Sequence, residues 1–483
     1  MDIKQKIEQL KQKFSNTSDI VDKELTTKNG HKIAIMYLDN VVDQLLLASS
    51  IIAPLQDLTA SNDTDIADLA LQKIISFGQV QKAKDTEDII TNILNGFCAI
   101  FFADSSQILI AHCAKWIVRT PIEPPTSAVV RGPREGFVED IITNMTLLRK
   151  RLKTPTLRVE NMQIGTRTNS EVRLVYLSDV ADPIIVEKVK EKLKSINIDG
   201  VVDSNYIAEF LQTGKHYIFK QIGTTEKPDI ATAKILEGRV AILVDGSPIA
   251  LTVPYILLED LQASNDYYTN AGRATFLRYI RLLSGLLAIL LPGIYVALLC
   301  HHIKVIPIKI LITITNSIQG IPLPPLLEML FIIFLFETLY EASLRMPRYM
   351  GLALSVVGAL ILGETAVQAG LISTPAVLIV AITGVMSYTL PELTNQISFL
   401  RLIFTILGGL LGIFGILLGA VFLVGYLANM DSYGAPYLAP FAPKIKNDQK
   451  DGLMRKTAIK QTTRPQSIKN KNKWRQKNDR TEQ

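Results

Sequence analysis

Three long stretches without a charged residue dominate the second half of the chain and most constrain its fold. They are residues 282–300, 365–391 and 402–429. The hydrocarbon core of a bilayer is about 30 Å thick, which a helix of roughly 20 apolar residues can cross. Several such runs close together predict a bundle of membrane-crossing helices rather than the buried core of a large soluble protein.

The rest of the chain has a different composition. Residues 1 to about 280 are polar with short apolar runs, as in a soluble globular region. With 48% hydrophobic and 20% charged residues, the chain fits neither an ordinary soluble enzyme nor a protein made only of membrane helices. Cys98, Cys113 and Cys300 cannot form a disulfide framework and lack metal-site spacing. Because no apolar core follows the charged start at Met1, we expect no secretory signal peptide.

The soluble half contains an internal repeat. Residues 94–100 resemble residues 236–242, with Leu, Gly, Ala and Ile coinciding at an offset of 142. In each copy an apolar run leads into an Asp/Ser/Gly turn and then a second apolar run, which is the pattern of a β-hairpin. Apolar residues recur at helical spacing in 183–198. We therefore predict an α+β fold: two related α/β subdomains followed by an all-α transmembrane bundle.

These patterns divide the chain into six segments. They are a flexible N-terminal segment (1–30), a first soluble subdomain (31–125), a linker (126–154), a second subdomain (155–275), a transmembrane domain (276–430) and a basic tail (431–483). From 442 to 483 the tail carries thirteen Lys/Arg against four Asp/Glu and one aromatic residue. Such a segment buries too little apolar surface to order itself, so we expect a disordered tail that contacts anionic lipid headgroups or only solubilises this end.

Charges beside the apolar runs predict the orientation. The basic tail, together with Arg273, Arg278 and Arg281 before the first run, favours cytoplasmic placement of both ends. Two ends on one side require an even number of crossings. We expect four full crossings plus a re-entrant pair, 305–316 and 326–340, around a proline cluster. Six full crossings are the alternative.

The linker holds an arginine-rich turn made of Arg131, Gly132, Pro133 and Arg134. It lacks phosphate-loop and Rossmann spacing, so nucleotide binding is not indicated. We expect this turn to contact another domain or subunit, with Asp140 near the start of a following helix. The basic run 147–152 is expected to be a solvated face rather than a surface for a membrane or an acidic partner.

Charged residues within the apolar half need partners. An ionisable group at bilayer depth costs about 2.5–3.5 kcal/mol unless it is paired or hydrated. Glu337, Glu341 and Arg345 share one helix face by their spacing, and Glu341 can pair with Arg345. Glu337 then needs water or another partner, which makes this set a candidate for an ion path or for coupling; wet charges at the interface are the alternative. Glu328 is expected to be an acid at a helix start.

Small residues recur every four positions from 351 to 363, and two pairs with the same spacing lie within the run 402–429. They are Gly351, Ser355, Ala359, Gly363, Gly408, Gly412, Gly415 and Gly419. Small residues at this interval let helices approach closely, either between subunits of a ring or within one chain. Val357, Leu360 and Glu364 lie three or four apart on one predicted face. Such a face can gate by dewetting and attract cations through its carboxylate, so these residues are candidates for a pore.

No catalytic constellation is found. His31, His112, His216, His301 and His302 do not stand at ligand spacings from cysteines or carboxylates. We expect no enzymatic activity, no cofactor, no metal site and no nucleic-acid partner.

Several strings resemble the GerA family of spore germination receptors, and specifically their A subunits. They are VRGPREGFVEDIITNMTLLRKRLKTPTLRVE (130–160), TTEKPDIATAKILEGRVAILVDGSPIALTVP (224–254), NDYY (265–268), LPGIYVAL (291–298), FETLYEASLRMPRYMG (336–351), VGALILGETAVQAGLIS (357–373) and SYGAPYLAPFAP (432–443). They occur in the family's order over about residues 90–443. The chain departs from the family pattern at Lys227, where Arg is expected, and at Glu364, where Gln is expected.

The resemblance implies a role in the inner membrane of a dormant bacterial endospore. There an A subunit is expected to act with a transporter-like B subunit and a lipoprotein C subunit. It would self-associate into a ring around a path for monovalent cations that opens in response to nutrients, in contact with membrane lipids. The residues leave two other functions open, a secondary transporter and a membrane scaffold.

Overall fold

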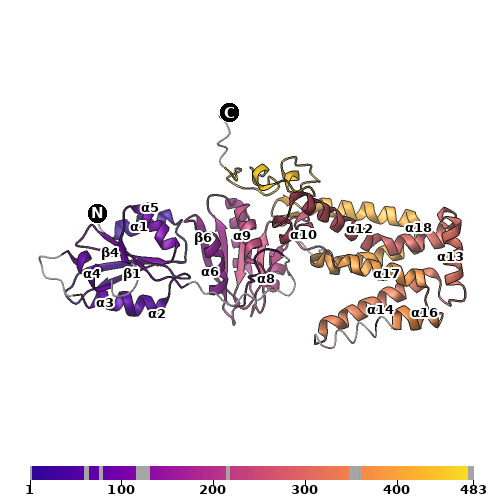
Figure 1. Cartoon of the computed structure of the whole chain (residues 1–483), viewed down its shortest axis with the longest axis horizontal. Coiled ribbons are helices and arrows are strands. Elements are labelled where there is room, and N and C mark those ends of the chain that lie inside the picture. The colour runs from indigo at the N-terminus through magenta and orange to yellow at the C-terminus, as the bar shows by residue number, and fades with distance from the viewer. Residues whose placement is uncertain are drawn as a thin grey trace.

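The computed structural model describes residues 3–58, 65–74, 80–115, 131–213, 218–347, 358 and 361–476. Figure 1 shows three parts in a row: a sheet with its helices at the N-terminal end, a second such unit in the middle, and a bundle of helices at the opposite end. The predicted fold class, two α/β units followed by an all-α region, is therefore confirmed.

The first unit is built on a five-stranded antiparallel sheet of order β1-β2-β4-β5-β3. Its elements are α1 (Ile3–Lys13), β1 (Ile20–Thr26), β2 (Lys32–Leu38), α2 (Gln44–Leu46), η1 (Leu47–Ile52), α3 (Ala53–Gln56), α4 (Ile66–Ile74), β3 (Val80–Lys82), α5 (Thr86–Leu94), β4 (Phe97–Phe102) and β5 (Ile108–His112). Successive side chains of a strand point to opposite faces. Ile33 and Ile35 of β2 pack with residues of the α2–α4 segment, whereas Ala34 and Met36 pack with residues of α1 and α5. Helices therefore cover both faces of the sheet.

The second unit repeats this plan, with strand order β6-β7-β9-β10-β8. Its elements are α6 (Ile141–Arg151), β6 (Leu157–Ile164), β7 (Ser170–Leu177), α7 (Pro183–Ser195), α8 (Ser204–Leu211), β8 (Gly223–Thr225), α9 (Pro228–Leu236), β9 (Val240–Val244) and β10 (Ala250–Val253). Both hairpins expected from the repeat are present, as β4–β5 and β9–β10. The helix expected at 183–198 is α7. The internal repeat therefore extends to the topology of the whole unit.

The repeat begins earlier than the predicted boundaries. The segment 1–30, expected to be flexible, contains α1 and β1, and Phe14 after α1 is fully buried in the first core. The linker 126–154 likewise contains α6, which stands before β6 as α1 stands before β1. The prediction followed the apolar hairpins. It missed α1 because this helix is rich in charged residues and buries only Ile7 and Leu10.

A buried ion pair joins the two sheet units. Arg149 of α6 donates to both carboxylate oxygens of Asp19, at 2.8 Å each, and the two side chains are 1% and 3% exposed. Beside it, the backbone N–H of Ser18 donates to the carbonyl of Val159 at 3.0 Å. The expectation that 147–152 is a solvated face is therefore wrong at Arg149, which faces the first unit.

The helical region follows two short helices. Its elements, with those helices, are α10 (Leu258–Leu261), α11 (Ser264–Tyr267), α12 (Ala271–His301), η2 (Ile303–Val305), α13 (Ile308–Ile318), α14 (Pro325–Arg345), η3 (Ile361–Thr365), α16 (Ala366–Gln368), α17 (Thr374–Ser387), η4 (Pro391–Leu393) and α18 (Thr394–Asn429). Among the described residues, two helical stretches are long and apolar enough to cross a membrane, Ala271–His301 and Pro391–Asn429.

The second of these stretches is folded back on itself. Gly412 interrupts the helical backbone with φ 63° and ψ −151°. A straight helix of 36 residues would be about 54 Å long. Yet Lys220 pairs with Glu392 at 2.7 Å, while the neighbouring Gln221 approaches the carbonyl of Asp431 at 3.4 Å. Both ends of α18 therefore lie beside the second sheet unit, so 401–429, expected to be one span, consists of two antiparallel helices.

The predicted re-entrant pair also differs from the structure. α14 has 21 residues, about 31 Å of helix, which is longer than the short segment expected at 326–340. It carries Glu328, Glu337 and Glu341, and these charges masked its length in the sequence. α13 has only 11 residues and runs across the far end of the bundle in Figure 1.

The C-terminal segment packs on the molecule. It contains β11 (Asp431–Ser432), β12 (Ala435–Pro436), η5 (Asp448–Lys450) and η6 (Ala458–Lys460). Tyr437 and Ile468 are fully buried, and the backbone N–H of Lys471 donates to the carbonyl of Val180 at 2.8 Å. Figure 1 shows the segment lying over the second unit and the start of α12. As far as residue 476, the prediction of a disordered tail is therefore wrong. It considered the apolar surface of the tail alone and not the surface on which the tail lies.

Candidate functional site at the junction of sheets and helices

Three of the sequence motifs meet where the second sheet unit joins α12. Gly132 lies against the ring of Tyr268: with φ at +123°, an added Cβ would come 2.5 Å from that ring. Tyr268 donates its hydroxyl hydrogen to Asp229 at 2.7 Å. The backbone N–H of Phe137 donates to the carbonyl of Glu226 at 2.7 Å. The arginine-rich turn therefore contacts another part of the same chain, and glycine is required at 132 by both its backbone and its neighbour.

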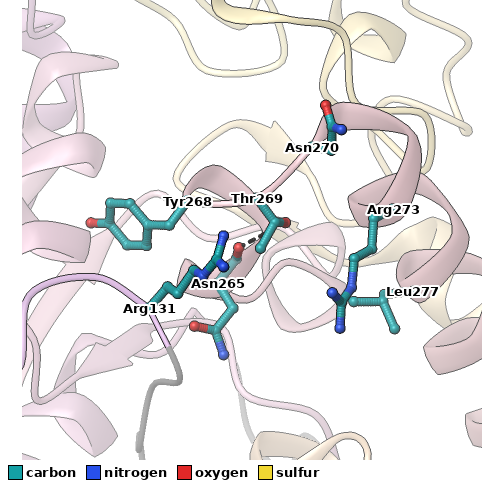
Figure 2. Close-up of a pocket in the computed structure, with 7 residues that line it drawn as sticks. All are labelled: Arg131, Asn265, Tyr268, Thr269, Asn270, Arg273 and Leu277. Atoms are coloured by element: carbon teal, nitrogen blue, oxygen red, sulfur yellow. Dashed lines mark hydrogen bonds between the residues drawn. The ribbon is translucent and has the colours of Figure 1, made fainter.

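A cavity of about 720 Å³ opens beside this contact (Figure 2). Its lining residues are Arg131, Asn265, Tyr268, Thr269, Asn270, Arg273 and Leu277. Two guanidinium groups and two amides are present in this lining, and no carboxylate is among these residues. Of the rest of the arginine-rich turn, Pro133 is half-buried and Arg134 is exposed.

A buried carboxylate fixes the first turns of α12. Asp266, in α11, is fully buried and accepts from Arg278 Nε at 3.0 Å. Arg281 Nη1 and Nη2 donate to its two oxygens at 2.8 Å each. The three arginines before the first apolar run were read as topology signals, but two of them bind the short helix α11.

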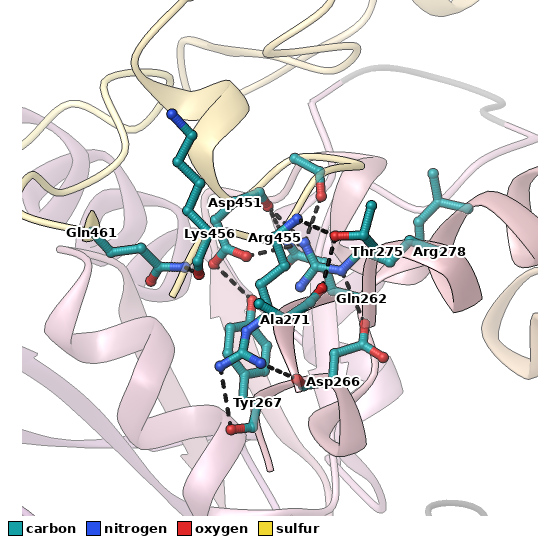
Figure 3. A network of polar contacts seen from close by, with 12 residues as sticks. Gln262, Asp266, Tyr267, Ala271, Thr275, Arg278, Asp451, Arg455, Lys456 and Gln461 are labelled. Carbon is teal, nitrogen blue, oxygen red and sulfur yellow. Dashed lines mark hydrogen bonds and ion pairs between the residues drawn. The ribbon is translucent and has the colours of Figure 1, made fainter. Parts of the chain in front are cut away.

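The C-terminal segment closes the same network (Figure 3). Arg278 Nη1 donates to the carbonyl and the carboxylate of Asp451, at 3.0 Å each, and the hydroxyl of Tyr267 donates to Asp451 at 2.9 Å. Arg455 Nη1 donates to the carbonyls of Asp266 and Thr269 at 2.6 and 2.8 Å. We call Asp266, Arg278, Arg281, Asp451 and Arg455 the junction network. It joins α11, α12 and the tail.

The pKa values of the two acids of the junction network are shifted in opposite directions. Burial alone would raise the pKa of Asp266, but the hydrogen bonds from Arg281 and Arg278 outweigh it and hold the pKa below its ordinary value. For Asp451, burial dominates and raises the pKa despite the nearby charge of Arg278, and the negative charge of Glu237 adds to the rise. Of the two acids, Asp451 is therefore the one that is protonated first as the pH falls.

A second cavity, of about 380 Å³, lies between α9, α10–α11 and the tail. Its main charges are already matched: Glu259 pairs with Lys234 at 2.6 Å and with Arg239 at 2.9 Å. Burial would raise the pKa of Glu259, yet the charges of Arg239 and Lys234 hold it below its ordinary value. Arg239 also pairs with Glu237, so two acids balance two cations in the second cavity, in contrast to the first.

Two ion pairs join residues of the apolar helices in the described part of the chain, and sequence analysis predicted one of them. Glu337 of α14 pairs with Arg401 of α18, and the hydroxyl of Ser398 donates to the same carboxylate. Arg401 is 1% exposed. The exposed pair Glu341–Arg345, at 2.6 Å, is present as the spacing suggested. Arg401 was missed because its charge was used to mark the start of an apolar run.

A second buried acid lies at the far end of the helical region. Glu328 is fully buried and accepts from the backbone N–H of Ser373 at 2.5 Å, just before α17 begins. The expectation of an acid at a helix start fits its position in α14, but its bond ties two helices together.

The predicted small residues have different surroundings. Gly408 lies against the backbone of Gly293 in α12, with no room for a Cβ on either residue. Gly412 forms the turn of α18, and Gly415 and Gly419 pack on Leu407 of the opposite half. All these contacts lie within one chain.

The remaining candidates lie in or beside a stretch that the structure does not describe. Gly351, Ser355, Val357, Ala359 and Leu360 are outside the described residues. Gly363 has no atom within 4 Å of an added Cβ. Glu364 is exposed and accepts from Gln368 at 3.2 Å. No group of three or more His, Cys, Asp or Glu suited to a metal ion occurs in the described part of the chain.

Duplicated sheet units fixed through buried arginines to apolar helices define a protein that links a folded soluble module to helices of the membrane type. The chain belongs to the Bacillus/Clostridium GerA spore germination protein family, whose profile matches residues 8–467.

Individual relatives agree with this assignment. Spore germination protein KA of Bacillus subtilis (strain 168) is 33% identical over 479 residues, covering 98% of this chain and 88% of that protein. YfkQ of the same organism, described as an uncharacterized membrane protein, is 35% identical over 466 residues, with coverages of 96% and 90%. The crystal structure of the N-terminal domain of the A subunit of the Bacillus megaterium spore germinant receptor GerK3 is 27% identical. It covers 52% of this chain and 94% of that chain, with a TM-score of 0.41. The family predicted from the motifs is confirmed.

Proposed function

We propose that this chain is the A subunit of a nutrient germinant receptor of the spore inner membrane. It assembles with copies of itself and with a transporter-like B subunit and a lipoprotein C subunit, and its helices open a path for monovalent cations. The observation that carries the proposal is the junction network. Tyr268 binds Asp229 of α9, and the neighbouring Asp266 holds both Arg278 and Arg281, so a displacement of the second sheet unit reaches the first turns of α12 through this short segment. A binding signal in the soluble half or in a partner subunit then has a mechanical route to the helices.

We propose six membrane passes. α12, α14, α17 and the two halves of α18 supply five. The sixth is proposed from the sequence alone, for the apolar stretch 350–372. Both sheet units and the tail then lie on one side, which the basic tail identifies as the cytoplasm.

The candidate pore remains Val357, Leu360 and Glu364. The test is cation flux from liposomes that contain the full chain, with its partner subunits for nutrient-triggered opening. We expect Leu360→Ala to raise the resting leak and Glu364→Gln to lower the preference for cations over anions. Leu378→Ala, at an exposed leucine of α17, is the matched control. Wild-type leak and selectivity in both pore variants, with normal assembly, would remove this helix face from the path.

A secondary transporter is the second candidate, because Glu328 and the Glu337–Arg401 pair are the kind of buried charges that transporters also use. Flux that saturates with substrate and requires a coupled solute would favour it. Current proportional to the driving force would favour a channel, and no flux at all would favour a scaffold.

A further inference from the structure

We propose that the cavity of Figure 2 binds a phosphate group, and that an anionic phospholipid supplies it. The phosphate chemistry rests on the cavity alone. The lipid as its source also rests on the proposed membrane passes.

Among the described residues that line the cavity, two carry a positive charge and none carries a negative one. Arg131 comes from the arginine-rich turn and Arg273 from the first turn of α12, so two distant segments each bring a guanidinium to one cavity. Both side chains are exposed, and neither makes a hydrogen bond or ion pair with another described residue. An anion in the cavity would give these charges a partner, and the guanidinium fork matches two oxygens of a phosphate.

The position of the cavity points to lipid. Leu277 is part of its lining, and the adjoining turns of α12 expose large apolar side chains. Phe276, Tyr279 and Leu283 are 63%, 47% and 58% exposed. A cationic cavity bordered by an exposed apolar helix surface fits a molecule with an anionic head and acyl chains, whereas free phosphate would leave that surface without a partner.

A bound phosphate would add a contact to the junction. It would connect the arginine-rich turn to α12 beside Tyr268. The headgroup would then help to hold the sheet unit against the helices, in addition to the bond between Tyr268 and Asp229.

The test is a titration of the delipidated full chain in detergent, followed by native mass spectrometry. The probes are dioctanoyl phosphatidylglycerol and inorganic phosphate. We expect the lipid to bind, and we expect Arg131→Gln and Arg273→Gln each to weaken it about fivefold, as for one basic residue at a charged lipid surface. Arg131→Lys and Arg273→Lys keep the charge and should retain most of the binding.

Two exposed basic residues serve as controls. Arg167→Gln changes an arginine in the β6–β7 turn, and Lys304→Gln changes a lysine at the other end of α12. Both should bind the lipid as the wild type does. If the two Gln variants at 131 and 273 also bind like the wild type, the site is refuted. If inorganic phosphate binds as well as the lipid and competes with it, the phosphate site stands and the lipid source is refuted. No cation flux is measured, so failure here leaves the proposed channel untouched.

Discussion

Two buried arginine–carboxylate joints hold this chain together, and they are built differently. Between the sheet units, one arginine satisfies one carboxylate, Arg149 with Asp19. In the junction network, Asp266 is shared by two arginines, and the tail supplies further acceptors to Arg278. Nη2 of Arg278 finds no acceptor among the residues that the structure describes. The first joint is complete with two segments, whereas the second depends on three and has unused donors. We infer that the second joint is the one that can rearrange.

The largest effect is expected from Asp266→Ala. It removes the buried carboxylate that Arg278 and Arg281 share and leaves Arg278 with Asp451 alone, and breaking a buried pair in this way costs about 3–5 kcal/mol. The thermal unfolding midpoint of the full chain in detergent should fall, and trypsin should cleave the tail near Arg455 and Lys456 faster. Asp199→Ala, at an exposed acid of the second sheet unit, should change neither. An unchanged rate of tail cleavage in Asp266→Ala would show that the network does not hold the tail.

Arg149→Met should cost a similar 3–5 kcal/mol, because it leaves Asp19 buried and unpaired. Tail cleavage, however, should stay at the wild-type rate, since this joint contains no tail residue. Adding Asp19→Leu removes the second charge and should recover most of the lost stability. If Arg149→Met also releases the tail, the two joints are coupled and the comparison fails.

Acidification should separate the two acids of the junction network. Asp266 has a folded pKa below its ordinary value of 3.8, so its stabilisation is complete above pH 3.8 and is lost as the pH falls through the folded value. The gap in unfolding midpoint between wild type and Asp266→Asn should therefore close below about pH 3.8. Asp451 has a raised pKa, so its contribution is complete below 3.8 and declines as the pH rises through its folded value. Asp451→Asn should show the opposite trend, and parallel curves would contradict this assignment.

A smaller effect is expected from Gly408→Ala. The added methyl group meets the backbone of Gly293, and such overpacking costs about 1–3 kcal/mol. Gly425→Ala, in the other half of α18, meets no atom within 4 Å and should be neutral or slightly stabilising. Equal unfolding midpoints for the two variants would show that α12 and α18 can move apart at Gly408 without loss of stability.

Local patterns account for the parts of the fold that the sequence predicts. The hairpins β4–β5 and β9–β10 follow from apolar runs around turn residues, and α7 follows from its helical period. The repeat in the first half therefore indicated the sheet units before their topology was known. The family motifs also marked Gly132 and Tyr268, which the fold brings into contact.

Local sequence patterns could not predict the two buried arginine–carboxylate joints. Asp19 and Arg149 are 130 residues apart, and Arg278 and Asp451 are 173 apart, so no local spacing connects them. The tail looked disordered because composition measures what a segment can bury by itself. Sequence analysis interpreted Gly412 as a residue that lets two helices pack closely. The apolar residues around it would look the same for a glycine that forms a turn, so the sequence did not distinguish the two roles.

On the proposed membrane topology, the fold at Gly412 places both ends of the chain on the same side of the bilayer. Hydropathy alone treats 391–429 as one pass, which would strand the tail across the bilayer from the sheets. Because the chain reverses at Gly412, the longest apolar stretch would enter and leave the bilayer on the same side. A reporter fused after residue 483 and one fused ahead of Met1 should therefore respond to the same aqueous quencher.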